Sequence, residues 1–158
     1  MNQLIGSGLI SKVILDLLQE TFEKSQGYFL DANTALFETL KNISAEQASI
    51  PVGGKCATLA AQVSHITFYL QSLEGVITGG GFQQVDWGEI WRTVNQVTQM
   101  EWESILSELQ QKYKYICSLV REKSAWNREE ELDSILGIIA HSAYHLGEIR
   151  QALCTISD

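Results

Sequence analysis

Proline and positive charge are scarce in this sequence of 158 residues, and cysteine is not much commoner. A single proline is present, and because each proline inside a helix would break it, this scarcity favours long, uninterrupted helices. The 11 lysines and arginines stand against 19 aspartates and glutamates, so the net charge is −8. That balance argues against a nucleic-acid-binding protein, which needs a basic face, and against an anionic membrane surface as partner.

Long apolar runs are also missing from the sequence. Charged residues interrupt every candidate well before the ~20 apolar residues that a membrane-spanning helix requires. The first ten residues contain no basic residue, and Gly6 and Gly8 interrupt their apolar run. The sequence therefore predicts neither a membrane span nor a signal peptide.

The three cysteines, Cys56, Cys117 and Cys154, are odd in number and far apart, and no two of them form a C-x-x-C pair. This pattern disfavours both a disulfide framework and a zinc knuckle. Each cysteine stands among apolar neighbours in a stretch with helical periodicity. We therefore expect three buried, reduced thiols and a cytoplasmic protein.

Hydrophobic periodicity divides the chain into four helical stretches, and no sustained alternation typical of strands is present. The predicted helices cover residues 11–40, 55–77, 88–123 and 128–156. We expect Gly27 to bend or break the first of them, with Asp31 as the N-cap of its second part. The glycine-rich connector 78–88 is long enough to cross one end of a bundle. These features predict an all-α fold, a four-helix bundle that forms a single domain over residues 1–158.

Three histidines carry the main chemical signal. His141 and His145 are four residues apart on one predicted helix, so their Cβ atoms are neighbours at roughly 5–6 Å. His65 lies near the middle of another predicted helix. On a helical wheel of about 100° per residue, each of the three stands at the edge of an apolar face. Such edges are where a pocket between two helices can form.

The histidines admit two interpretations. Three neutral imidazoles without a fourth protein ligand leave coordination positions open, as in catalytic or substrate-binding metal sites. A site of this kind would lose metal affinity below about pH 6, as the imidazoles gain protons. Three imidazoles suit zinc, nickel, copper or iron, so the pattern alone does not choose the metal. The other interpretation is structural, because buried histidines are common in cores and His-x-x-x-His also occurs in helices by chance.

Glu148 follows His145 by three residues, on the same side of the predicted helix. In that position a carboxylate can accept a hydrogen bond from a ligand imidazole or act as a general base, and we single it out as the candidate catalytic residue. An ordinary solvated glutamate is the alternative. The candidate pocket walls are aromatic: Tyr69, Trp91, Trp102 and Tyr144.

Residues 138–149, Ile-Ile-Ala-His-Ser-Ala-Tyr-His-Leu-Gly-Glu-Ile, resemble the histidine motif of the DinB/YfiT-like superfamily. That motif is a helix with His-x-x-x-His, followed by a small residue, Gln or Glu, and an aliphatic residue. Residues 59–66, which include His65, resemble the superfamily's upstream histidine helix. Weaker likenesses at residues 35–48 and at Trp102 extend the resemblance over residues 34–156. The chain departs from the pattern at Glu148, where glutamine is common, and in residues 1–30, which are longer than expected.

The resemblance implies a four-helix bundle of up-down-down-up topology, with a long second-to-third helix connection near Gly79. It also implies a divalent metal, nickel or zinc most commonly, on His65, His141 and His145, and a homodimer. Some members are thiol S-transferases that use bacillithiol, mycothiol or glutathione, and one branch is a mycothiol-dependent maleylpyruvate isomerase.

The combined hypothesis is a metal-dependent enzyme that activates a low-molecular-weight thiol or a water for attack on a small-molecule substrate. A thiol S-transferase and a small hydrolase are both compatible with it. Two further alternatives remain open: a non-catalytic, stress-related bundle that binds a metal or ligand, and an interaction module whose histidines are structural.

Overall fold

The computed structural model describes residues 6–156, and within them the chain forms helices and no strand. The long helices are α1 (Ser7–Phe22), α4 (Leu59–Ile77), α6 (Gln99–Glu122) and α7 (Glu129–Ile156). The short ones are α2 (Leu36–Leu40), α3 (Ala45–Ala48), the 3-10 turn η1 (Val52–Gly54) and α5 (Glu89–Thr93). Residues 1–5 lie outside the described part of the chain, and they are half of the ten residues considered above as a signal peptide. None of the described helices combines the length and apolarity needed to cross a membrane.

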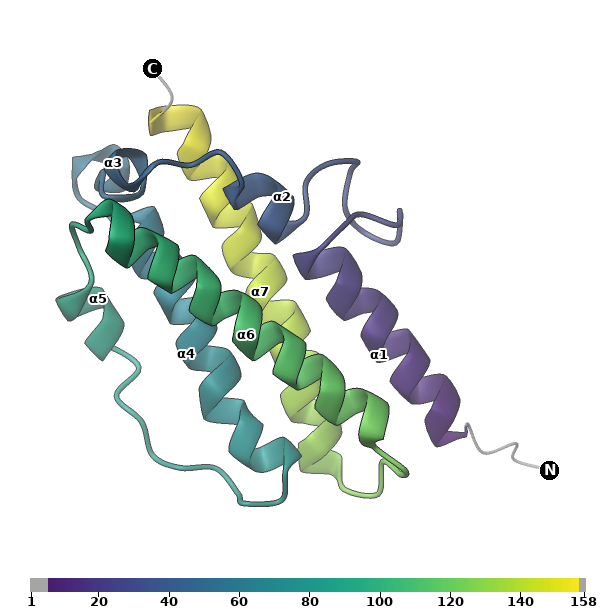
Figure 1. Cartoon of the computed structure of the whole chain (residues 1–158). Helices are drawn as coiled ribbons and strands as arrows, with labels where there is room; N and C mark the ends of the chain where they lie inside the picture. Colours follow the sequence, from purple (N-terminus) through teal and green to yellow (C-terminus); the bar gives the residue numbers. More distant parts are fainter. Residues whose placement is uncertain (1–5, 157–158) are drawn as a thin grey trace.

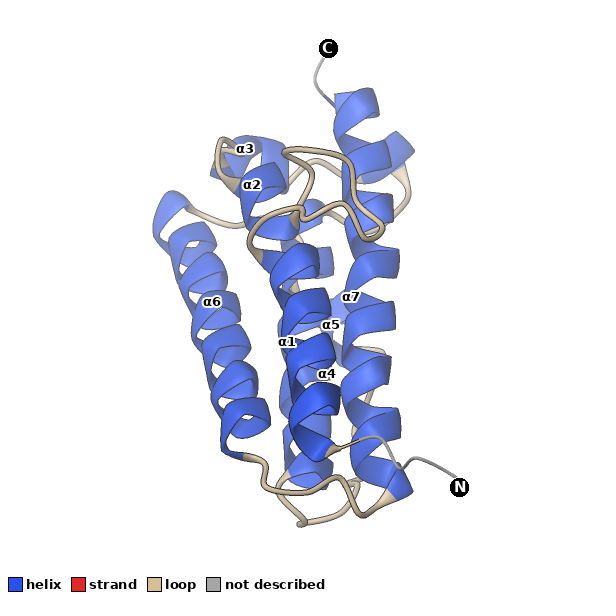
Figure 2. Ribbon diagram, turned by 90° about the vertical axis from the view of Figure 1, so that its right-hand side faces the viewer, coloured by secondary structure: helices blue, strands red, loops and turns tan. Residues whose placement is uncertain are grey.

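The long helices α4, α6 and α7 pack together in a bundle-like arrangement, and α1 packs against α6 and α7. In Figure 1, α4 and α6 start at the same end of the molecule, whereas α1 and α7 run the opposite way. Figure 2 shows the long helices side by side with roughly aligned axes. The largest fully buried side chains form the core between them: Leu18, Phe22, Leu36, Leu59, Ile66, Leu70, Trp102, Leu109, Ile116, Ile135, Ile138 and Leu146.

The prediction of a single helix over residues 88–123 is wrong. The chain forms α5 and α6 instead, with an extended interruption between them. Thr98 ends the interruption, because its Oγ1 accepts from the Glu101 N–H while the Glu101 carboxylate accepts from the Thr98 N–H at 2.7 Å. This reciprocal capping box starts α6 at Gln99. The connection from α4 to α6 therefore spans residues 78–98, and α5 within it packs on α4.

The predicted helix over residues 11–40 also differs from the structure. Helix α1 ends at Phe22, and Asp31 is not an N-cap, because α2 begins only at Leu36. The second predicted helix, 55–77, begins at Leu59, where the Thr58 side chain caps it by accepting from the Ala61 N–H. The fourth, 128–156, agrees with α7.

Buried Glu20 explains why the chain leaves the helix after α1. Its carboxylate accepts the backbone N–H groups of Tyr28, Phe29 and Leu30 at distances of 2.7–3.0 Å. Burial alone would raise the pKa of Glu20, but these hydrogen bonds outweigh it and hold the pKa below its usual value. Since the three N–H groups bond to a side chain, they do not take part in a helix. Glu20 thus folds this loop back onto α1.

The expectation of three buried cysteines is wrong for two of them. Cys117 is buried, whereas Cys56 and Cys154 are exposed, and all three are free thiols. Cys56 lies in the turn before α4, outside any helix, and Cys154 lies on the outward side of the last turns of α7. Apolar sequence neighbours therefore did not report the direction in which either side chain points.

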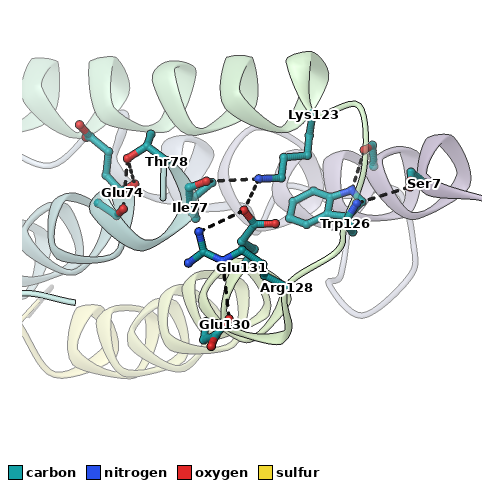
Figure 3. Close-up of polar contacts among 11 residues, drawn as sticks. Ser7, Glu74, Ile77, Thr78, Lys123, Trp126, Arg128, Glu130 and Glu131 are labelled. Atoms are coloured by element: carbon teal, nitrogen blue, oxygen red, sulfur yellow. Dashed lines mark hydrogen bonds and ion pairs between the residues drawn. The ribbon is translucent and has the colours of Figure 1, made fainter. Parts of the chain in front are cut away.

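A polar network joins the ends of several helices at the α6–α7 turn (Figure 3). Lys123 pairs with Glu131, which is buried at the start of α7, and donates to the carbonyl of Ile77 at the end of α4. Trp126 in the turn donates its indole N–H to the Ser11 hydroxyl of α1 at 2.9 Å. These contacts fasten α1, α4, α6 and α7 to one another at this turn.

Candidate metal centre

The three histidines of the sequence meet between α4 and α7. His65 lies on α4, and His141 and His145 lie on α7, which packs directly against α4. The ring centroids of His65 lie 5.0 Å from His141 and 4.9 Å from His145, and the two α7 rings are 4.5 Å apart. One nitrogen from each ring lies within 4.8 Å of the other two. The cluster could therefore hold one metal ion among three imidazoles.

Two ring nitrogens in the cluster have unused hydrogen-bonding capacity. Nδ1 of His65 and Nε2 of His141 are buried and have no hydrogen-bond partner among the described residues. Leaving a buried polar group unpaired costs about 1–3 kcal/mol, so such groups in a folded protein call for a partner. A divalent cation is a partner that fits, because nitrogen lone pairs of neutral imidazoles are good ligands for zinc and nickel.

His145 is oriented through its other nitrogen. Its Nδ1 lies 2.8 Å from Oε2 of Glu148 and 3.2 Å from Oε1 of Gln62. Both oxygens are acceptors, so Nδ1 carries the proton and Nε2 keeps its lone pair. A carboxylate behind a histidine in this way fixes the tautomer and the ring direction of a metal ligand. The sequence suggested this place for Glu148, but the contact of Gln62 depends on how α4 packs on α7.

Burial controls the protonation of the cluster. It lowers the pKa of His65 to about 4, with a further contribution from neighbouring His145, while Glu148 acts in the opposite direction. Burial, His145 and His65 together lower the pKa of His141 to about 4. The pKa of His145 is also lowered by burial, against the opposing effect of Glu148. The rings are therefore neutral at pH 7, and the loss of metal affinity expected below pH 6 moves to lower pH.

Aromatic side chains surround the cluster. Tyr69 stacks on His141 with ring centroids 3.7 Å apart and planes at 14°. The ring centroid of Trp91, on α5, lies 4.4 Å from that of His65. The ring of Tyr144 meets that of His145 edge to face, with centroids 5.1 Å apart. Three of the four aromatic residues that the sequence suggested therefore contact the histidine rings.

Trp102, the fourth suggested wall, has a different place. It is buried and donates its indole N–H to the carbonyl of Ile43 at 2.8 Å. It thereby attaches α6 to the segment between α2 and α3.

A glycine in α7 makes room for the stacked tyrosine. The hydroxyl of Tyr69 lies 3.3 Å from the point where a Cβ on Gly137 would stand. That distance is tighter than most Cβ contacts, so a larger residue at position 137 would press on Tyr69 and, through it, on His141. Glycine inside a helix is unfavourable by about 1 kcal/mol relative to alanine, and here close packing beside the histidines gives a reason for it.

The chain matches no family model, no curated protein and no solved structure. The likeness to the DinB/YfiT-like superfamily stays a resemblance, carried by the histidine motif and its surroundings in the sequence.

Proposed function

We propose that this chain is a DinB/YfiT-like protein that binds a divalent metal, nickel or zinc, through His65, His141 and His145. In this proposal the four long helices form the superfamily's up-down-down-up bundle. The observation that carries it is the pair of buried, unpartnered nitrogens on His65 and His141, which lie within a cluster of three converging imidazoles. A purely structural histidine cluster would be expected to satisfy those nitrogens with hydrogen bonds.

A divalent ion in this place would lower the pKa of a thiol or water that takes an open coordination position. The side chains of the protein supply the rest. Glu148 and Gln62 hold the ring of His145 in one tautomer. Glu148 is also the proposed general base: its side chain is 38% exposed, and because its carboxylate lies on the Nδ1 side of His145, it would take the proton of the activated thiol or water through an intervening water. Trp91 and Tyr69 cover the cluster and limit the access of bulk water.

The reaction class proposed is attack by the activated thiolate on a small electrophile, in which an S–C bond forms while the bond to the electrophile's leaving group breaks and that group departs with the electron pair, a thiol S-transferase-like activity. Protein loaded with nickel or zinc would be screened with low-molecular-weight thiols and a chromogenic electrophile. We expect turnover with at least one thiol, and its loss in Glu148→Gln. Turnover without any added thiol would favour a hydrolase, and silence across the panel would favour a non-catalytic metal-binding protein.

Metal content tests the site itself. Protein purified without an affinity tag and incubated with nickel or zinc should retain about one equivalent after dialysis, measured by elemental analysis. His145→Ala should lose most of it, because only two imidazoles remain. Glu129→Gln, an exposed position in the first turn of the same helix, serves as the matched control and should retain the metal. Wild-type protein with less than about a tenth of an equivalent would contradict the metal proposal.

A further inference from the structure

A cavity of about 510 Å³ lies beside the hydrogen-bond partners of His145. Its lining includes Val52, Cys56, Gln62, Tyr144, Gly147 and Glu148. None of the three histidines lines it, so the cavity is distinct from the metal cluster, and Gln62 and Glu148, which line the cavity, connect the two through their contacts with His145. Its volume falls within the range of about 300–1,000 Å³ that is usual for small-molecule sites.

The lining of this cavity carries a negative charge and no positive one. Glu148 is the only charged side chain among its lining residues, and Lys55, although next to Cys56 in sequence, is not one of them. Among the described residues, no lysine or arginine forms an ion pair with Glu148, whose carboxylate interacts with the imidazole of His145 and the hydroxyl of Tyr144. An anionic ligand would therefore meet a carboxylate without a compensating cation, whereas a cationic ligand would supply the missing counter-charge.

The other walls define the rest of the ligand. Tyr144 is 63% exposed at the cavity, and an aromatic face attracts an ammonium group within about 6 Å. Val52, Gly147 and Ala152 provide an apolar surface. A second cavity, between α4, α5 and α6, also contains a carboxylate, but at about 240 Å³ it is smaller than usual ligand sites.

We propose that the cavity beside His145 binds a small organic cation, an amine on an apolar body, with the ammonium group against Glu148 and Tyr144. The apolar body lies along Val52 and Ala152. This site is additional to the metal cluster and does not require a metal to be bound.

Three ligands that share a benzyl group test the charge preference: benzylamine, benzyl alcohol and phenylacetate. They would be titrated calorimetrically into the metal-free protein, so that phenylacetate has no metal to bind. Benzylamine should bind about tenfold more tightly than phenylacetate, and Glu148→Gln should bring benzylamine to within about twofold of benzyl alcohol. Equal binding of phenylacetate and benzylamine, or no binding of benzylamine at millimolar concentration, would overturn the proposal.

Gly147 offers a way to locate the ligand. A Cβ built at Gly147 meets nothing within 4 Å, so the start of a larger side chain fits there, and we expect the ring of Gly147→Phe to occupy part of the cavity that Gly147 lines. Benzylamine binding should be lost in Gly147→Phe and kept in Gly147→Ala, with helical circular dichroism unchanged in both. Full binding by a folded Gly147→Phe variant would place the ligand elsewhere.

The two exposed cysteines give an independent readout in the wild-type protein. Cys56 lines the cavity, whereas Cys154 is exposed outside it. Benzylamine should slow alkylation of Cys56 and leave that of Cys154 unchanged, as measured by peptide mass spectrometry. Unprotected Cys56 at saturating benzylamine would contradict the cavity site. Metal binding without amine binding would refute only this proposal, and amine binding without metal binding would refute only the proposed metal site.

Discussion

Removing the hydrogen-bond partners of His145 should weaken metal binding while leaving all three imidazoles in place. The changes are Glu148→Ala, Gln62→Ala and the double variant. Glu148 accepts from Nδ1 of His145 at 2.8 Å, and Gln62 lies 3.2 Å from the same nitrogen. Each single variant therefore keeps one acceptor for the Nδ1 proton, and only the double variant leaves it without a protein partner.

The magnitude follows from the two contacts. Loss of a hydrogen-bond partner behind a metal-bound histidine typically costs 10–100-fold in metal affinity. Glu148 makes the shorter and charge-assisted contact, and such hydrogen bonds are roughly twice as strong as neutral ones. We therefore expect a loss of about tenfold in Glu148→Ala, or about 1.4 kcal/mol, and a smaller loss in Gln62→Ala. In the double variant the loss should approach about 100-fold, or about 2.7 kcal/mol, more than the sum of the single losses.

Competition against a chromophoric chelator at pH 7.5 would measure these affinities. Glu129→Gln, which removes one negative charge from the first turn of α7, controls for the change in overall charge. The reasoning would be refuted by a folded double variant that binds zinc or nickel within about twofold of wild type. In that case the imidazole of His145 would be positioned by packing alone.

Four further predictions concern pH and stability. Because burial lowers the pKa of His65 and His141 to about 4 and that of His145 below its usual value, metal affinity should begin to fall at a lower pH than that at which free imidazoles gain protons; a steep fall already at pH 6.5, seen by the same competition, would contradict it. Because folding lowers the pKa of these histidines, the unfolded chain binds more protons than the folded one between about pH 6.5 and 4. The melting temperature of the metal-free protein should therefore decrease as the pH falls from about 6.5 to 4. Trp102→Phe removes the hydrogen bond to the Ile43 carbonyl and should lower the free energy of unfolding by about 1–3 kcal/mol in urea titrations, and an unchanged midpoint would disagree. Glu20→Gln should cost about 1.5–3 kcal/mol at pH 7, and because folding lowers the pKa of Glu20, that difference from wild type should shrink as the pH falls below about 4.5.

Periodicity predicted the faces of the helices well, and those faces brought the histidines together. The wheel placed His141 and His145 at the edge of the apolar face of their helix, and His65 beside the apolar stripe of another. In the structure His65 and His145 are buried, and His141 is half-buried. Since the faces of α4 and α7 that carry these edges pack on each other, the edges converge. Helix α7 was predicted within one residue at its start because three glutamates mark it.

The errors arose where one side chain decides the local structure. The apolar pattern continues from α5 into α6, yet Thr98 and Glu101 form a capping box that starts a new helix. That Thr-x-x-Glu spacing was visible in the sequence, and it outweighed periodicity. The loop held by Glu20 and the contact from Gln62 to His145 had no such signal. They depend on the distance and rotation between elements that periodicity does not report.

Two of the three clustered histidines lie on one helix and the third on another, and this difference in sequence separation affects how the cluster assembles. His141 and His145 become neighbours as soon as α7 forms, whereas His65 joins them only when α4 docks on α7. Bringing His65 to α7 closes the chain segment between residues 65 and 141, and the conformational entropy lost in that closure opposes the contact of His65 with the other two histidines. A nascent α7 already offers a bidentate pair to a metal, and docking of α4 adds the third imidazole. If a metal also binds His141 and His145 before α4 docks, both the folded and the incompletely folded chain hold the ion. The completed site then stabilises the folded state by less than its own metal affinity would suggest.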